Sequence, residues 1–187
     1  VRAAREGFVE DLRTNISLIR RRLRNPNLII RRFSIGVRSD TDVAMIYFRG
    51  ITASKIVCEV ERRLQNISID APIGSGSIQG LIEDHPYSPF PTMLATERPD
   101  KVVANLVEGK VAVIVDGTPF ALLAPASLGD FFQTSDDYNE KWLIASLFRL
   151  TRYITALIGV VTPAVYIAIT TFHPGLLPTP LTITIAN

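Results

Sequence analysis

The sequence predicts an α/β fold, a mixed sheet packed with helices, followed by a transmembrane helix. Two observations support this prediction. Segments with helical and with strand-like patterning alternate through most of the chain, and the last 35 residues contain no Asp, Glu, Lys or Arg. We predict four regions: a cytosolic α/β subdomain at 1–134, an amphipathic linker helix at 135–152, the transmembrane helix at 153–172 and a post-span segment at 173–187 that leads to further membrane region.

The first third of the chain is predicted as helix, strand, strand, helix. Apolar residues spaced by four, four, three and four positions indicate a helix over 8–24, which the Pro26 turn ends. Leu28–Ile35 and Val43–Phe48 are rich in Ile, Val and aromatic residues and predict strands. Helical spacing returns over 53–65, with Glu59 and Arg63 as an exposed i,i+4 pair. The apolar residues expected to face the core are Phe8, Leu12, Ile16, Ile19, Leu23, Ile56, Val60 and Leu64.

The next segment is interrupted by glycines and prolines. Gly74–Ser77 is predicted as a loop that opens a short helix with Ile78, Leu81 and Ile82 on its apolar face. Pro86, Pro89 and Pro91 exclude regular structure after that helix. Thr92–Thr96 is then predicted as a strand.

A helix and a hairpin complete the predicted domain. Pro99 suits the first turn of a helix, and Gly109 suits its end. Val111–Val115 is continuously apolar, which is typical of a strand buried on both faces. Asp116-Gly117-Thr118 predicts a turn, and Pro119–Ala124 predicts the returning strand. The apolar face of the helix is expected to consist of Val102, Val103, Leu106 and Val107.

The membrane prediction is based on Tyr153–Phe172, 20 residues without a charge. At about 1.5 Å per residue this helix covers a hydrocarbon core of roughly 30 Å. The alternative, a buried core helix, would leave 35 uncharged residues to be covered by a small domain. Pro163 is tolerated in a membrane helix and implies a kink. Ser135 is the expected N-cap of the preceding helix, with acids at Asp136, Asp137 and Glu140 and apolar residues at Trp142, Leu143, Leu147, Phe148 and Leu150.

The cations beside this span predict its orientation. Arg149 and Arg152 lie immediately before it, and no Lys or Arg follows it. By the positive-inside rule, residues 1–150 face the cytosol.

No catalytic, cofactor-binding or metal-binding residues are predicted, and the protein is predicted not to be an enzyme. Gly74–Gly80 lacks the Lys-Ser/Thr ending of a phosphate-binding loop, which favours an ordinary turn. Glu83, Asp84 and His85 are adjacent and do not converge from regular structure. With one other histidine, His173, and one cysteine, a structural zinc site is disfavoured. Cys58 is expected to be a small packed helix residue.

The basic N-terminal region raises the question of an anionic partner. Residues 1–38 contain ten arginines and three acids, a local charge of +7. Nucleic acid is disfavoured as a partner because no aromatic residues are interleaved with the arginines and the chain continues into a span. A solvated face, a subunit contact and a contact with anionic lipid remain open.

Four blocks of the sequence resemble the spore germination A subunits of the GerA type. They are REGFVEDLRTNISLIRRRLR at 5–24, LIEDHPYSPFP at 81–91 with TERPDK at 96–101, LVEGKVAVIVDGTPF at 106–120 and AITTFHP at 168–174. The blocks are long and occur in order, so the resemblance covers essentially the whole chain. The sequence departs from the family at Arg2-Ala3-Ala4, where members usually have Arg-Gly-Pro.

The resemblance implies a role that the residues alone do not show. A full-length member is expected to have two cytosolic α/β subdomains and several membrane helices. It would lie in the spore inner membrane with an integral-membrane B subunit and a lipoprotein C subunit. Such a complex responds to nutrients and starts germination with ion release, and the A subunit is expected to form a homo-oligomer. This chain would comprise the second subdomain and the first span.

Three functional hypotheses follow. The first is a membrane subunit for signal coupling, assembly and ion release, without a catalytic step. The second is a germinant-binding module, in which the cytosolic α/β domain captures a small molecule. The third is a membrane-anchored enzyme.

Overall fold

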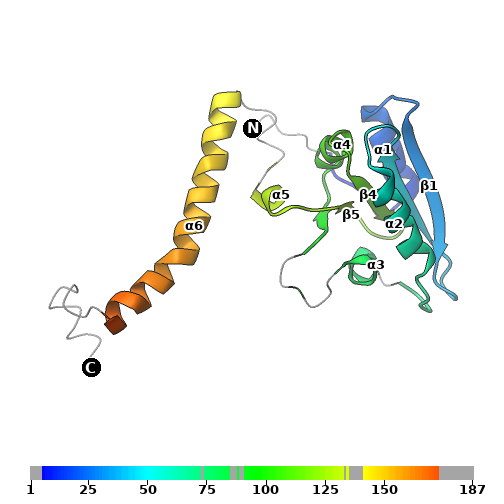
Figure 1. Cartoon of the computed structure of the whole chain (residues 1–187). Coiled ribbons are helices and arrows are strands. Elements are labelled where there is room, and N and C mark those ends of the chain that lie inside the picture. Colours follow the sequence, from blue (N-terminus) through cyan, green and yellow to red (C-terminus); the bar gives the residue numbers. More distant parts are fainter. Residues whose placement is uncertain are drawn as a thin grey trace. The chain divides into compact units, whose positions relative to one another are not determined.

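The computed structural model describes residues 6–72, 74–84, 88, 91–132, 134 and 141–172. The chain divides into two compact units, 1–136 and 137–187, and each is considered by itself. The first unit is an α/β domain and the second contains one long helix (Figure 1).

The sheet of the first unit has five strands in the order β1-β2-β4-β5-β3. Their bounds are β1 Leu28–Ile35, β2 Thr41–Phe48, β3 Leu94–Thr96, β4 Val111–Val115 and β5 Ala121–Ala124. All four pairings between the described strands are antiparallel. The predicted α/β class is confirmed. The prediction of a mixed sheet was wrong, because these pairings include no parallel one. The chain between β2 and β4 contains three helices and a strand at the far edge, so β4 returns beside β2 in the opposite direction.

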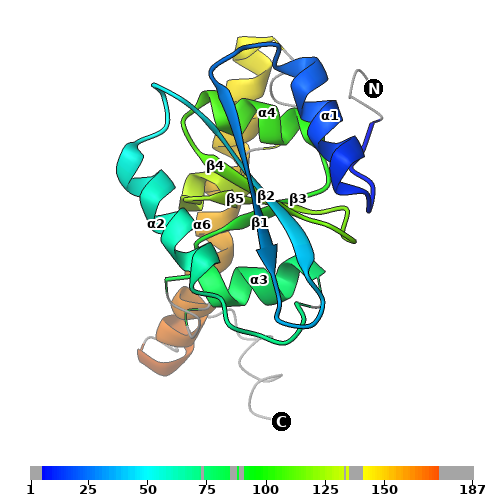
Figure 2. The same cartoon turned by 90° about the vertical axis from the view of Figure 1, so that its right-hand side faces the viewer.

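Helices cover both faces of this sheet. One apolar cluster joins α1 (Leu12–Arg22) and α4 (Pro99–Val107) to the sheet, and α1 and α4 lie side by side (Figure 2). The second cluster joins α2 (Ser54–Gln65) and α3 (Gly74–Ile82) to the other face. Side chains of β4 alternate between the two clusters, so that all five of its residues are buried. The predicted doubly buried strand is therefore confirmed.

The first helix begins later than predicted. Its N-cap is Asp11, whose carboxylate accepts a hydrogen bond from the Thr14 N–H over 2.7 Å. Phe8 precedes the helix in extended chain, where its N–H donates to the Glu97 carbonyl over 2.8 Å, yet its side chain is buried in the same cluster as Leu12. The apolar spacing identified the residues that reach the core but did not show where the helix starts.

The helices α2 and α3 differ from the prediction in three positions. Gly74–Ser77 forms the first turn of α3 instead of a loop. Leu81, expected in the core, has 48% of its surface exposed, whereas Ile78 and Ile82 are buried one turn apart. On α2, Val57 is buried and Ile56 only partly buried, because α2 is rotated slightly from the predicted face.

The predicted helix and hairpin near residue 110 are confirmed. Pro99 occupies the first turn of α4, and Gly109 follows the helix with φ +93°, a left-handed conformation that glycine adopts without strain. Val102 and Leu106 are fully buried, but Val107 is 50% exposed, which narrows the predicted apolar face. The short helix α5 (Leu128–Phe132) follows β5.

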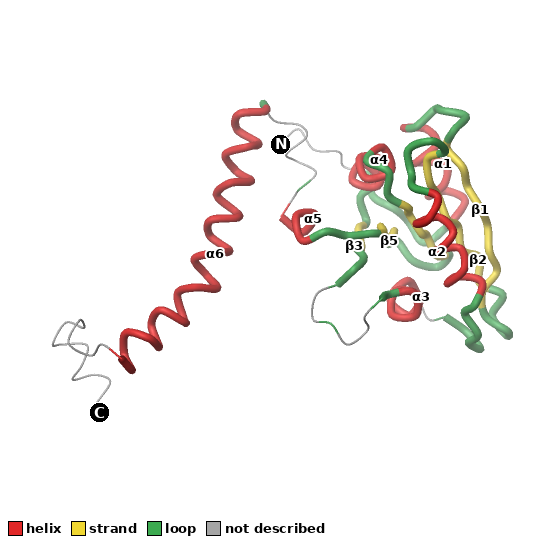
Figure 3. Tube along the Cα trace, viewed as in Figure 1, coloured by secondary structure: helices red, strands yellow, loops and turns green. Residues whose placement is uncertain are grey.

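The second unit contains α6, a continuous helix over Trp142–Phe172 (Figure 3). The predicted linker helix and span therefore share one helix of 31 residues, which runs through Pro163. By its length and composition it is long and apolar enough to cross a membrane. The predicted N-cap region at 135–140 and the prolines Pro86 and Pro89 lie outside the described residues.

Candidate functional site

A cavity of about 500 Å³ lies between α2, the end of α3 and two further segments, the residues just before β3 and the end of β5 with the residues after it. Its walls combine apolar side chains with four charged ones. The lining residues are Lys55, Ile56, Glu59, Val60, Arg63, Ile82, Asp84, Thr92, Met93, Ala124, Pro125 and Ala126. This volume falls within the range of about 300–1,000 Å³ that is usual for small-molecule pockets.

Arg63 organises the charged side of the cavity. Its guanidinium donates from Nε to Glu59 over 2.7 Å and from one Nη to the Ile82 carbonyl over 2.5 Å. The other Nη pairs with the Asp84 carboxylate. These contacts fix the C-terminal end of α3 against α2. Hydrogen bonds from Arg62 and then from Arg63 lower the pKa of Glu59 to about 2, so this carboxylate stays ionised.

The cavity therefore has an apolar base and a rim with charges of both signs. Lys55 is exposed at this rim and has no ion-pair partner among the described residues. Such an arrangement suits a small apolar molecule with an anionic group. The sequence missed this site because its residues come from α2, α3 and the β5 region, far apart in the chain.

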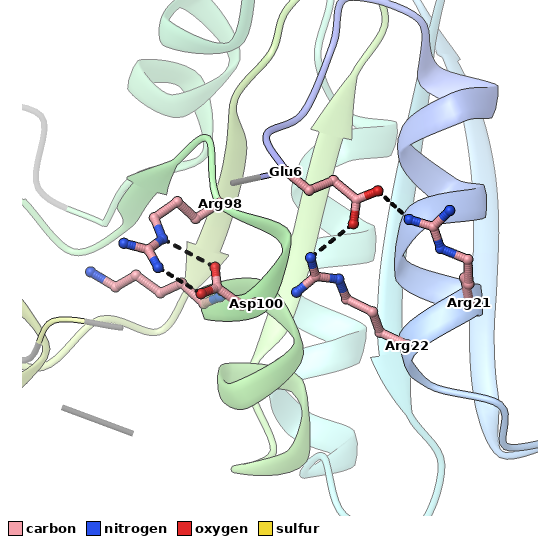
Figure 4. Close-up of polar contacts among 6 residues, drawn as sticks. Glu6, Arg21, Arg22, Arg98 and Asp100 are labelled. Atoms are coloured by element: carbon pink, nitrogen blue, oxygen red, sulfur yellow. Dashed lines mark hydrogen bonds and ion pairs between the residues drawn. The ribbon is translucent and has the colours of Figure 1, made fainter. Parts of the chain in front are cut away.

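The arginines near the N-terminus form two groups, and one of these is paired. Glu6 accepts hydrogen bonds from both Arg21 and Arg22, the latter over 2.8 Å, and these bonds lower the pKa of Glu6 (Figure 4). Close by, Arg98 makes a two-pronged contact with Asp100 over 3.2 and 2.8 Å (Figure 4). Two further arginines of residues 1–38 pair with acids outside that region, Arg31 with Glu61 and Arg38 with Asp70, so the local charge of +7 is partly neutralised within the domain.

The remaining arginines of α1, and Arg24 just after it, are not neutralised in this way. Arg13, Arg20 and Arg24 are exposed, and within the described part of the chain none of them has an ion pair. The sequence predicted the cluster but could not separate these members from Arg21 and Arg22. That distinction depends on Glu6, which folding brings beside the last turn of α1.

A second polar cluster fastens α5 to the domain. Asp130 is buried, and it accepts hydrogen bonds from Lys110 Nζ over 2.5 Å and from the Ser127 N–H over 2.6 Å. Burial alone raises the pKa of Asp130, but these bonds outweigh it and hold that pKa below its ordinary value. The Ser127-x-x-Asp130 spacing is that of a capping box, a local signal that the sequence analysis did not use.

The positions considered for chemistry are not brought together. Cys58 is exposed on α2, so its prediction as a packed residue was wrong, because it points away from the buried face of Val57, Val60 and Leu64. Asp84 is engaged by Arg63, while His85 and His173 lie outside the described residues. Among the residues that the structure describes, no group of three His, Cys, Asp or Glu side chains could hold a metal ion.

Comparison with known proteins now decides the family. The profile of the Bacillus/Clostridium GerA spore germination protein family matches residues 1–187. The chain belongs to the GerA family. Spore germination protein B1 of Bacillus subtilis is 46% identical to this GerA-family chain over 186 residues, and spore germination protein KA of the same organism is 49% identical over 185. The alignments cover 100% and 99% of the chain but 38% and 34% of those relatives.

A solved structure supports the same relationship. The N-terminal domain of the A subunit of the Bacillus megaterium spore germinant receptor GerK3 is 46% identical and superimposes with a TM-score of 0.54. The match covers 66% of the GerA-family chain and 98% of that domain. The resemblance stated from the sequence blocks is therefore confirmed. Since the chain spans little more than a third of its curated relatives, the activity of a whole receptor subunit does not transfer to it directly.

Proposed function

We propose that the chain is the part of a germinant receptor A subunit that joins a cytosolic α/β subdomain to its first membrane helix. It acts in signal coupling and assembly during nutrient-triggered germination, and contributes to ion release without a catalytic step. One observation supports this most: an α/β unit similar to a receptor A-subunit domain continues in the same chain into a helix that is long and apolar enough to span a membrane.

The proposed organisation follows the four regions predicted from sequence. Residues 1–134 form the cytosolic subdomain, 135–152 the amphipathic linker, 153–172 the span and 173–187 the lead into further membrane region. The partners are an integral-membrane B subunit, a lipoprotein C subunit and further copies of the A subunit, in the spore inner membrane. Arg149 and Arg152 support the cytosolic placement of residues 1–150.

The coupling role can be tested at Pro163. Proline removes the N–H that would bond the Gly159 carbonyl, so α6 carries a local weakness where it can bend or meet a neighbouring helix. We expect Pro163→Ala in the full-length subunit to slow nutrient-triggered germination while subunit levels stay normal. Val165→Ala on the same helix is the matched control. Normal germination of Pro163→Ala spores would exclude this role for the proline.

The cavity beside Arg63 supports a second candidate function, germinant binding by the α/β subdomain itself. Its volume and mixed rim suit a nutrient with an apolar body and a carboxylate. Calorimetric titration of the detergent-solubilised chain with candidate nutrients should give saturable heat that Lys55→Gln weakens and Lys101→Gln does not. If no nutrient binds, this second function is excluded and the coupling role is unaffected.

A further inference from the structure

The outward face of α1 carries a row of arginines that the domain leaves unneutralised. Arg13, Arg20 and Arg24 are separated by seven and four positions, which places them on one side of the helix or its immediate end. Leu12, Ile16 and Ile19, roughly a quarter turn further round the helix, are buried against the sheet. These three arginines are called the arginine row below.

Ion pairing is otherwise common among the arginines of this unit. Arg21 and Arg22 pair with Glu6, Arg31 pairs with Glu61, and Arg98 pairs with Asp100. Arg62 and Arg63 share Glu59. Asp11 interacts electrostatically with Arg13 at the start of the row, but within the described part of the chain none of the three arginines forms an ion pair. A shortage of acidic residues in the fold does not explain this. The arginine row leaves a surface with a net positive charge available to an external anion.

The row ends at a hollow that two of its arginines line. A cavity of about 280 Å³ is lined by Arg20, Leu23, Arg24, Asn25, Pro26 and Leu28. Its lining has two guanidinium groups and an amide, and includes no acidic residue. Arg49 lies next to the same loop, since its backbone N–H donates to the Asn27 carbonyl over 2.8 Å. Like the row, Arg49 is exposed and has no ion pair within the described residues.

Guanidinium groups favour phosphate over most other anions, because their planar N–H groups bind two phosphate oxygens at once. The same chain carries α6, which is long and apolar enough to hold the domain at a bilayer. Tethering keeps lipid headgroups at high effective concentration. Each Lys or Arg close to a negatively charged membrane surface raises the equilibrium constant for binding to that surface about fivefold.

From these observations we propose that the arginine row binds the phosphate groups of anionic phospholipids, and so docks the α1 face of the subdomain onto the membrane in which α6 is anchored. The hollow between Arg20 and Arg24 receives one headgroup. The paired arginines Arg21 and Arg22 do not take part. This inference is independent of the receptor role proposed above, since it requires only a bilayer and this chain.

The test uses the full chain with Cys58→Ala and Ser17→Cys, labelled at position 17 with an environment-sensitive fluorophore. Ser17 is exposed on α1 between Arg13 and Arg20. The protein is reconstituted into phosphatidylcholine vesicles with or without phosphatidylglycerol. We expect blue-shifted emission only with phosphatidylglycerol, and a return toward the phosphatidylcholine value in 0.5 M salt.

Substitutions then separate the row from general charge. Arg20→Gln with Arg24→Gln should lower the docking equilibrium about twenty-five-fold, the product of two arginine contributions. Arg38→Gln with Arg62→Gln removes the same charge from the β1–β2 turn and from α2 on the other face, and should leave the shift intact. Circular dichroism checks that both double variants are folded. Equal emission in both lipid compositions would overturn the proposal and would favour an acidic protein surface as the partner of the arginine row. An equal loss of the emission shift in both double variants would also overturn it.

Discussion

Lys110, immediately before β4, donates a hydrogen bond from Nζ to the Asp130 carboxylate in α5 over 2.5 Å. Lys110 also donates to the Asn105 side chain on α4 over 2.8 Å. The pair therefore connects α4, the central sheet and α5, the last described helix of the first unit. Both side chains are largely withdrawn from solvent, with 15% and 10% of their surfaces exposed.

We predict that Asp130→Asn destabilises the domain by about 2 to 4 kcal/mol, because it removes the nearer counter-charge of the largely buried Lys110 ammonium and leaves only Glu108, at 3.9 Å. Urea denaturation of the chain in mild detergent, followed by far-UV circular dichroism, measures this change, since α6 is expected to stay helical in the micelle. Ser127→Ala, which removes one neutral hydrogen bond to the same carboxylate, is the milder control at about 1 kcal/mol. Similar stability of Asp130→Asn and wild type would show that the pair contributes nothing.

The same pair predicts a dependence of stability on pH. The pKa of Asp130 lies below its unfolded value of 3.8, so the unfolded state binds the proton more readily than the folded state. The contribution of this carboxylate is therefore complete above that value and is lost as the pH falls through the lower, folded pKa. Between pH 5 and pH 3 the free energy of unfolding should fall less steeply in Asp130→Asn than in wild type. Parallel curves would contradict the assignment.

We expect the carboxyl group of Glu59 to titrate near pH 2, as carbon-13 NMR can measure directly. Arg62→Gln removes the largest cause of the lowered pKa and should move the titration toward the ordinary value of 4.5. Arg31 pairs with Glu61 and not with Glu59, so Arg31→Gln is the control and should leave the Glu59 titration unchanged. If Glu59 titrates at the same pH in Arg62→Gln as in the wild-type protein, the ion pair between Glu59 and Arg62 does not persist in solution.

Two glycine substitutions should have opposite effects on stability. Gly36 has φ +101°, and an added Cβ would lie 2.9 Å from Pro72 Cδ and closer still to Ser39 Oγ. Gly36→Ala therefore combines backbone strain with overpacking and should cost about 2 to 4 kcal/mol. Gly80 lies in α3 with open space around the added Cβ, so Gly80→Ala should stabilise by about 0.5 to 1 kcal/mol. Urea denaturation of both variants checks the sign; a stabilised Gly36→Ala would refute the turn geometry.

The orientation of the span can be tested with single cysteines at Asp136 and Thr179. Cys58 is exposed and must first be replaced by alanine. In intact cells an impermeant maleimide should label position 179 and leave position 136 protected until the membrane is opened. This expectation follows from Arg149 and Arg152, which favour the cytosolic side before the span. The reverse labelling pattern would place the α/β subdomain outside the cytosol.

Local patterns in the sequence were enough to locate most elements. The uninterrupted apolar run Val111–Val115 predicted a strand buried on both faces, and the absence of charge after residue 152 predicted a long apolar helix. Both are properties of neighbouring residues, so they can be recognised without knowing what packs against them. The family blocks likewise depend on residue order alone, and the family profile confirmed them.

Tertiary structure decided which strands pair and which charges are neutralised. The antiparallel sheet order β1-β2-β4-β5-β3 depends on β3 reaching the far edge, which no local pattern specifies. Glu6 selects Arg21 and Arg22 from the arginine cluster because folding brings it to the end of α1, and it leaves Arg20 and Arg24 unpaired. Lys110 meets Asp130, and Arg63 meets Asp84, for the same reason. These contacts join side chains that lie 15 to 21 residues apart in the sequence, and only the packing of the fold places them within hydrogen-bonding distance.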